Sequence, residues 1–131
     1  MRTILAILIL ALWTLSSHAA VPPTDAVWNS DRSAAAAAFP GTTGTRVVAY
    51  LRRDDGAFTE VDLSPVERKN FGRLGRKPAD YERYETKPIA WLSREDDFLQ
   101  VTVQTRAWRG GQRYTALEHV LLRADGAVLW R

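Results

Sequence analysis

The chain contains no cysteine, one methionine and two histidines among its 131 residues. The absence of cysteine excludes a disulfide scaffold, a thiolate zinc site, a cysteine nucleophile and a lipid-bearing N-terminal cysteine. Because His18 belongs to the first twenty residues, His119 is the sole imidazole in the rest of the chain. A lone histidine without cysteine excludes the common zinc constellations.

Motifs that bring catalytic groups together are missing as well. There is no glycine-rich phosphate loop, no Gly-x-Ser-x-Gly elbow and no defensible pair of catalytic carboxylates. The Asp54-Asp55 and Asp96-Asp97 pairs lack the spacing of a calcium-binding loop. We therefore expect no cofactor, no metal ion and no enzymatic activity.

What is present is typical of one water-soluble domain. Hydrophobic residues make up 46% of the chain and charged residues 25%, and the formal net charge is +3. These values exclude a disordered acidic tail, a collagen-like repeat and a polytopic membrane protein. The small basic excess does not by itself favour binding to nucleic acid.

Residues 1–20 have the features of a secretory signal peptide. Arg2 precedes an unbroken apolar run from Ile4 to Trp13, and Ser17-His18-Ala19 has the small-x-small pattern of a cleavage site. The run is short for a membrane-spanning helix, which needs about 20 apolar residues. We expect cleavage after Ala19 or Ala20 and a periplasmic or secreted protein with no stable transmembrane span. An uncleaved anchor is the alternative.

Residues 21–44 are interpreted as a lead segment that contains an alanine-rich helix from Asp25 to Phe39. Asp25 or Ser30 can cap this helix, the run of alanines has the best intrinsic helix propensity, and Pro40-Gly41 ends it. A flexible lead is the alternative, because alanines bring little side-chain area to bury.

From Thr45 the pattern changes to strands, and residues 45–131 are expected to form a single α+β domain. The segment from Leu99 to Ala107 alternates with period two, as a strand with one wet face does. Pro88 marks its own segment as an edge strand or a bulge. The expected strand segments, separated by turn signals, are residues 47–51, 58–63, 81–92, 99–107, 114–122 and 128–130.

A short mid-chain helix is expected from Ser64-Pro65-Val66-Glu67, a capping box with proline at the first helical position, to Gly72 or Gly75. The predicted fold is α+β, with five or six strands in one antiparallel meander sheet, one N-terminal helix and this mid-chain helix. Over about the last seventy residues this order loosely resembles cystatin-type and NTF2-type domains. That resemblance implies a sheet curled around a helix.

The strongest local anomaly in the sequence is a group of five basic residues within ten positions. We call it the basic cluster: Arg68, Lys69, Arg73, Arg76 and Lys77. Such a group attracts anionic surfaces, including phospholipid headgroups and acidic proteins. The alternative is a solvated helix face paired with Asp80, Glu82 and Glu85. Export and the scarcity of interleaved aromatic residues both argue against nucleic acid as a ligand.

Three further residues are candidates for a functional role. Glu118 and His119 lie on a strand whose two faces are both partly apolar, so one of them points into an apolar layer and could act as a pocket acid or base. The alternative for His119 is an exposed position with one hydrogen-bond partner. Trp108 falls on the polar side of its strand, where it is either an interface anchor or packing under a helix.

The sequence favours a small exported, non-catalytic binding protein of the bacterial envelope. Its expected partner is a protein or an anionic envelope component, bound through a sheet face or the basic cluster. The alternative is an NTF2-like small-ligand binder or enzyme that uses Glu118 and His119 in a pocket.

Overall fold

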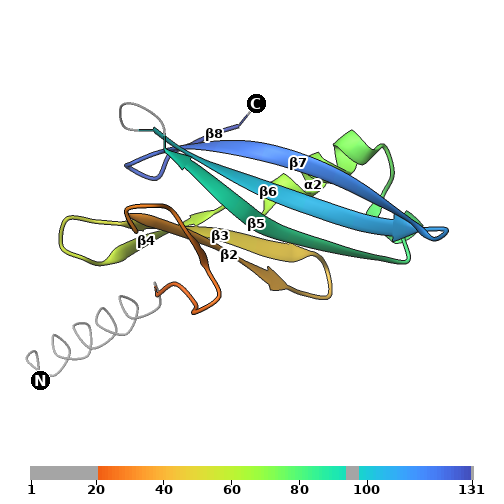
Figure 1. The fold of residues 1–131 in the computed structure, drawn as a ribbon, viewed down its shortest axis with the longest axis horizontal. Coiled ribbons are helices and arrows are strands. Elements are labelled where there is room, and N and C mark those ends of the chain that lie inside the picture. Colours follow the sequence, from red (N-terminus) through yellow and green to blue (C-terminus); the bar gives the residue numbers. More distant parts are fainter. Residues whose placement is uncertain (1–20, 94–97, 131) are drawn as a thin grey trace, which may run out of the picture.

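The computed structural model describes residues 21–93 and 98–130, and its strands form two antiparallel sheets (Figure 1). The predicted signal peptide, residues 1–20, lies outside the described residues. The first sheet has the order β1 (Val27–Trp28), β2 (Ala34–Pro40), β3 (Thr45–Arg52), β4 (Phe58–Asp62). The second has the order β5 (Arg83–Ser93), β6 (Phe98–Arg109), β7 (Gln112–Arg123), β8 (Val128–Leu129). Between the sheets in sequence come helix α2 (Pro65–Leu74) and the short 3-10 helix η1 (Pro78–Asp80).

The predicted N-terminal helix is wrong, because its alanine run forms strand β2. This strand pairs with β3 in unbroken register from Ala34 opposite Leu51 to Pro40 opposite Thr45. Residues 34–37 are all buried, with the even-numbered alanines facing the core between the sheets and the odd-numbered ones packing near Tyr50 on the other face. Small side chains fit a strand that is covered on both faces. Pairing and burial therefore outweigh the helix propensity of alanine.

The predicted single meander sheet is also wrong, and so is the sheet-around-helix architecture of cystatin-type and NTF2-type domains. The last four strands, which form the second sheet, do run as an antiparallel meander, but the first four strands form a separate sheet that packs against it. Without an N-terminal helix, the alanine strand provides the surface on which the second sheet closes. The main core joins the two sheets and contains Ala34, Ala36, Val47, Ala49, Leu51, Val61, Leu63, Val66, Val101, Val103, Val120 and Leu122.

Helix α2 is present as predicted, but the expected capping-box contacts are not. Ser64 makes no capping hydrogen bond to the helix; its hydroxyl accepts one from the Val47 N–H at 3.2 Å. The Glu67 carboxylate accepts one from the Thr45 N–H at 3.1 Å. Both side chains therefore tie the start of the helix to β3. The helix ends at Leu74 and is capped by Gly75. The φ of Gly75 is 78°, which is a left-handed conformation that glycine adopts without strain.

The inner face of the second sheet is longer than the first sheet can cover. Helix α2 lies beside β6 and β7 over the remaining part, toward the right in Figure 1. A second apolar cluster forms there, in which Phe71 of the helix packs with Tyr81 and Ala107. The rings of Phe71 and Tyr84 meet edge-on at 5.0 Å between centroids. This packing fixes the helix that carries the basic cluster.

Candidate functional site

The basic cluster is divided between two sides of α2. Toward β7 and β8, the Arg73 Nε donates to the Glu118 Oε2 at 2.9 Å, and the Lys69 Nζ lies 5.6 Å from the centre of the Trp130 ring. The Glu118 side chain is only 6% exposed, so its charge depends on Arg73 for compensation. These two members of the cluster have structural partners.

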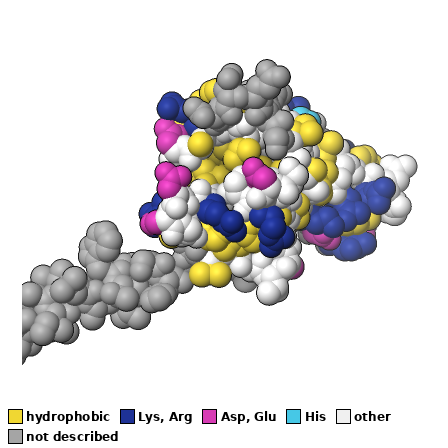
Figure 2. Space-filling view, turned by 60° about the vertical axis from the view of Figure 1, so that its left-hand side comes forward, with side chains coloured by type: hydrophobic (Ala, Val, Ile, Leu, Met, Phe, Trp, Pro, Cys, Tyr) yellow, Lys and Arg dark blue, Asp and Glu magenta, His cyan; other side chains and the backbone are white. Residues whose placement is uncertain are grey.

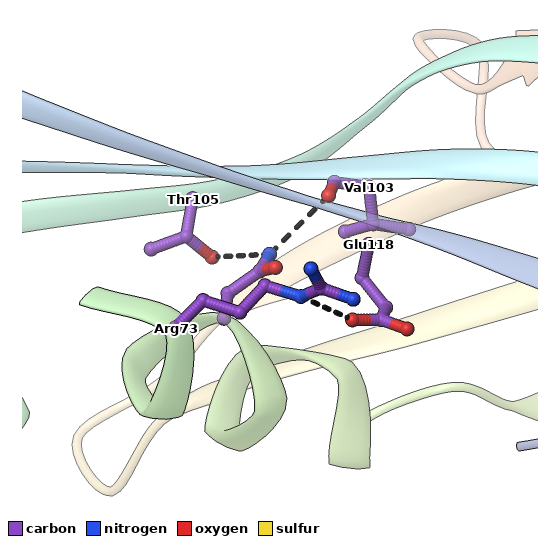
Figure 3. A network of polar contacts seen from close by, with 5 residues as sticks. Arg73, Val103, Thr105 and Glu118 are labelled. Atoms are coloured by element: carbon purple, nitrogen blue, oxygen red, sulfur yellow. Dashed lines mark hydrogen bonds and ion pairs between the residues drawn. The ribbon is translucent and has the colours of Figure 1, made fainter. Parts of the chain in front are cut away.

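A buried polar network lies under the same side of the helix (Figure 3). The Asn70 side chain is fully buried, and its Nδ2 donates to the Val103 carbonyl at 3.2 Å and to the Thr105 hydroxyl at 3.0 Å. The hydroxyls of Thr105 and Thr86 are 2.9 Å apart. Hydrogen bonds thus join the helix to β6 and, through the Thr105 hydroxyl, link this contact to β5. A mispositioned helix would leave these buried groups unpaired, at a cost of about 1–3 kcal/mol each.

The other three basic residues face away from this network. Arg68, Arg76 and Lys77 line an open depression of about 560 Å³, together with Phe71, Gly72, Gly75, Pro78 and Asp80. We call this the helix depression. Within the described part of the chain, none of the three cations forms an ion pair. Their charges are therefore available to a partner.

Two of the three downstream carboxylates that were the alternative partners of the cluster are engaged elsewhere, whereas Asp80 lines the helix depression itself. Asp80 accepts a hydrogen bond from the Lys77 backbone N–H at 3.1 Å, and Glu82 accepts one from the Gly110 N–H at 2.8 Å. Glu85 lies 3.2 Å from the Lys87 ammonium and 3.7 Å from the Arg106 guanidinium. Neutralisation of the whole cluster by these three acids is therefore not what the structure shows.

A second hollow of about 450 Å³ adjoins the helix depression. The two share Arg68, Phe71 and Pro78, and the second is also lined by Thr43, Gly44, Thr45, Arg46, Ser64 and Glu67. Glu67 forms part of its wall, held by the Thr45 N–H, and its Oε2 is buried with no hydrogen-bond partner within the described residues. Burial, and then the nearby Glu67 carboxylate, raise the pKa of Tyr84 above its ordinary value.

Charge on the surface is mixed rather than uniformly basic. In the view of Figure 2, Lys and Arg side chains occur in groups beside Asp and Glu side chains and around a field of hydrophobic ones. At hairpin turns the opposite charges pair, as Arg53 does with Asp55 and Arg123 with Asp125. Net charge therefore says little about binding. The local lack of partners at the helix depression is what distinguishes it.

Glu118 and His119 do not form a common pocket. As neighbours on β7 they point to opposite faces of the second sheet. Glu118 points inward and is buried against Arg73, whereas His119 is exposed, with its Nδ1 2.8 Å from the Thr102 hydroxyl. Trp108 lies on the same outer face as His119, and the Arg83 guanidinium stacks 3.8 Å from the centre of its ring.

Sequence reasoning missed the two polar residues that orient the helix. Asn70 was overlooked although it follows Val66 by four positions, which places it on the buried stripe of α2. A polar residue in a buried stripe is a signal of a specific hydrogen-bonded contact. Glu67 was recognised only as a helix cap, since nothing in its spacing points to Thr45.

Further classes of site are not seen. Among residues 21–93 and 98–130 there is no group of three or more His, Cys, Asp or Glu side chains that could hold a metal ion. In the same ranges no helix is long and apolar enough to cross a membrane.

No protein-family model, no curated protein and no solved structure matches the chain. The described residues thus form two packed antiparallel sheets, and helix α2 carries most of a basic cluster in which Arg73 pairs with a buried carboxylate.

Proposed function

We propose that this protein is a small exported, non-catalytic binding protein of the bacterial envelope, and that it binds an anionic envelope component through the helix depression. The first twenty residues support export, because they have the arrangement of a signal peptide. The helix depression supports the choice of ligand charge. Its lining combines three cations and one carboxylate, Asp80, with the apolar side chains of Phe71 and Pro78.

The observation that carries this proposal is the contrast in pairing within one cluster. Arg73 is held by Glu118, whereas Arg68, Arg76 and Lys77 have no ion pair among the described residues. Each basic residue close to an anionic lipid surface contributes about 1 kcal/mol. Three of them would favour weak, reversible attachment that is lost as salt concentration rises.

A catalytic pocket built from Glu118 and His119 is not proposed. The two side chains lie on opposite faces of the second sheet, and the Glu118 carboxylate is occupied by Arg73. A general acid and base must reach the same substrate, which this geometry does not allow.

The test is charge reversal in the helix depression. The variant R68E/R76E/K77E is expected to lose co-sedimentation with vesicles that contain anionic phospholipid, because three attractions become repulsions. The matched control, R32E/R53E/R123E, changes the net charge equally at the β1–β2, β3–β4 and β7–β8 turns, none of which lines the helix depression, and should retain most of the binding. Full binding by the first variant, or equal loss by both, would refute the proposed site.

A further inference from the structure

The two long outer strands of the second sheet differ in how their edges are protected. The outer edge of β5 is interrupted, because a bulge lies between Pro88 and Ala90 and proline cannot donate a ladder hydrogen bond. It also lies against β1 and β2, and the Trp91 indole N–H donates to the Val27 carbonyl at 2.8 Å. Proline, a bulge and a covering element are the usual means of preventing further strand pairing.

The outer edge of β7 carries no proline and no bulge in its pairing with β6, although helix α2 packs against the inner face of this strand. Strand β8 pairs only with Leu121 and Leu122, and within the described ranges no strand pairs with the outer side of residues 113–119. The register with β6 runs without a bulge from Phe98 opposite Arg123 to Arg109 opposite Gln112. We call residues 113–119 the open edge.

The hairpin register shows which backbone groups of the open edge lack partners. Gly110 and Gly111 form a two-residue turn with φ of 58° and 78°, so Arg109 and Gln112 form the hydrogen-bonded pair that closes it. Alternate residues of β7 from Gln112 onward therefore bond to β6. The residues between them direct their N–H and C=O groups outward: Arg113, Thr115, Leu117 and His119.

The outer face of the sheet carries an unpaired cation beside the open edge. On the outer face, Arg113 has no ion pair within the described part of the chain, and His119 is exposed. On the inner face, Arg73 and Glu118 compensate each other, and Glu118 is the sole carboxylate of β7. The strand therefore presents no free carboxylate that would repel an acidic chain. An acidic chain beside this edge would gain both hydrogen bonds and charge complementarity.

We propose that the open edge of β7 binds an acidic, extended segment of a partner protein, which adds to the second sheet as a further strand. Backbone hydrogen bonds to the four outward-facing residues supply the affinity of such strand addition. Side chains opposite Arg113 and His119 would be acidic. The side chain opposite Leu117, which is 39% exposed, would be apolar. This site is separate from the helix depression, so either can fail without the other.

A second copy of this chain fits the open edge less well than an acidic segment does. Antiparallel pairing of two β7 edges would place both α2 helices on the same side of the joined sheet. Pairing centred on residue 116 would place Arg113 of each copy opposite His119 of the other, and β7 has no free carboxylate to complement Arg113. Charge thus favours an acidic partner over self-association.

The experiment uses two synthetic peptides as probes while amide hydrogen exchange is followed by NMR: an acidic one, Ac-Glu-Thr-Val-Thr-Thr-Thr-Glu-Thr-amide, and a basic one with Lys in place of each Glu. In antiparallel pairing the two charged positions lie opposite Arg113 and His119, and the valine lies opposite Leu117. The acidic peptide is expected to slow exchange at Arg113, Thr115, Leu117 and His119 by about tenfold or more, since protection follows the bound fraction. The basic peptide should leave these amides unprotected. Equal protection by both peptides, or none by the acidic one at saturating concentration, would overturn the proposal.

Two variants separate strand addition from simple charge attraction. Thr115→Pro removes an outward N–H that β6 does not use, and should abolish protection, whereas Thr115→Val keeps that N–H and should bind normally. Arg113→Glu leaves the backbone intact and should weaken the acidic peptide at least threefold, about 0.7 kcal/mol. Unchanged binding by Arg113→Glu would remove the acidic preference. Concentration-dependent protection without peptide, with a dimer in light scattering, would identify a second copy as the occupant and contradict the proposal.

Discussion

Both sides of helix α2 carry arginine side chains, but among the described residues only the side toward β7 has an arginine in an ion pair. Toward β7, Arg73 compensates a buried carboxylate and lies beside Asn70, which donates two hydrogen bonds to β6. Toward η1, Arg68 and Arg76 face an open hollow with no ion-pair partner in the described residues. One side of the helix holds it in place, and the other presents charge to solvent.

This difference shows why a group of basic residues in a sequence is not by itself a binding site. Five charges within ten positions form a single feature in the sequence, but helical geometry distributes them around the axis. Arg73, which lies beside the buried Glu118 carboxylate, contributes to the stability of the fold. Those that line the helix depression are free to contribute to binding, so substitutions on the two sides should have separable effects.

The largest effect on stability is expected at Asn70. Asn70→Ala removes the donor to the Val103 carbonyl and the Thr105 hydroxyl and leaves a cavity in a fully buried position. The free energy of unfolding should fall by about 2–4 kcal/mol. Denaturant unfolding followed by circular dichroism measures it. A loss similar to that of Arg76→Ala, expected to be within about 0.5 kcal/mol of wild type, would show that the network does not anchor the helix.

Arg73→Ala should have the next largest effect, because it leaves the Glu118 carboxylate buried without its cation. We expect a loss of about 1–3 kcal/mol in the free energy of unfolding, smaller than for a fully buried pair since Arg73 is partly solvated. Adding Glu118→Gln should restore part of that loss by removing the unpaired charge. A double-mutant cycle measures the coupling, and a coupling near zero would contradict the structural role of the pair.

A smaller effect is expected at alkaline pH from Tyr84. Its pKa is raised in the folded protein, first by burial and then by Glu67, so its contribution to stability is fully present below its ordinary pKa. Above about pH 10 the unfolded chain releases this proton before the folded protein does, and stability falls as pH rises through the folded pKa. Tyr84→Phe should make that decline shallower in unfolding curves recorded at several pH values. Parallel declines for the two proteins would show that Tyr84 does not contribute.

The smallest effect on stability is expected on the η1 side. R68E/R76E/K77E removes no ion pair among the described residues, and its free energy of unfolding should change by at most about 0.5 kcal/mol for each exposed site. Thermal unfolding measures it. If this variant lost as much stability as Arg73→Ala, the two sides of the helix would not be functionally distinct.

Local sequence signals predicted the hairpin of β3 and β4, the strand from Leu99 to Ala107 within β6, and helix α2. Glycine turns, period-two alternation and proline at a helix start act over a few residues. They failed for the alanine run of β2, whose conformation depends on pairing with β3 and on cover from the second sheet. Contacts between segments distant in sequence determine whether such a run forms a strand. The intrinsic helix propensity of its residues does not reveal those contacts.

The same limit applies to the candidate site. The basic cluster was found from sequence because charges adjacent in the chain are visible there. Its division was not, because Glu118 is 45 positions from Arg73. Glu118 and His119 were grouped by adjacency, although neighbours on a strand face opposite ways. Contacts made across the fold, rather than proximity in sequence, determined which charges remain unpaired.

The most direct measurement places a reporter on each region and asks which one touches an anionic surface. The chain has no cysteine of its own, so Ala79→Cys in η1 and Ala124→Cys in the turn before β8 each give one labelling site for an environment-sensitive fluorophore. With vesicles that contain anionic phospholipid, the label at Ala79 should shift to an apolar emission and become protected from an aqueous quencher, while the label at Ala124 remains as in buffer. An unchanged label at Ala79 in vesicle-bound protein, or equal shifts at both positions, would contradict the account.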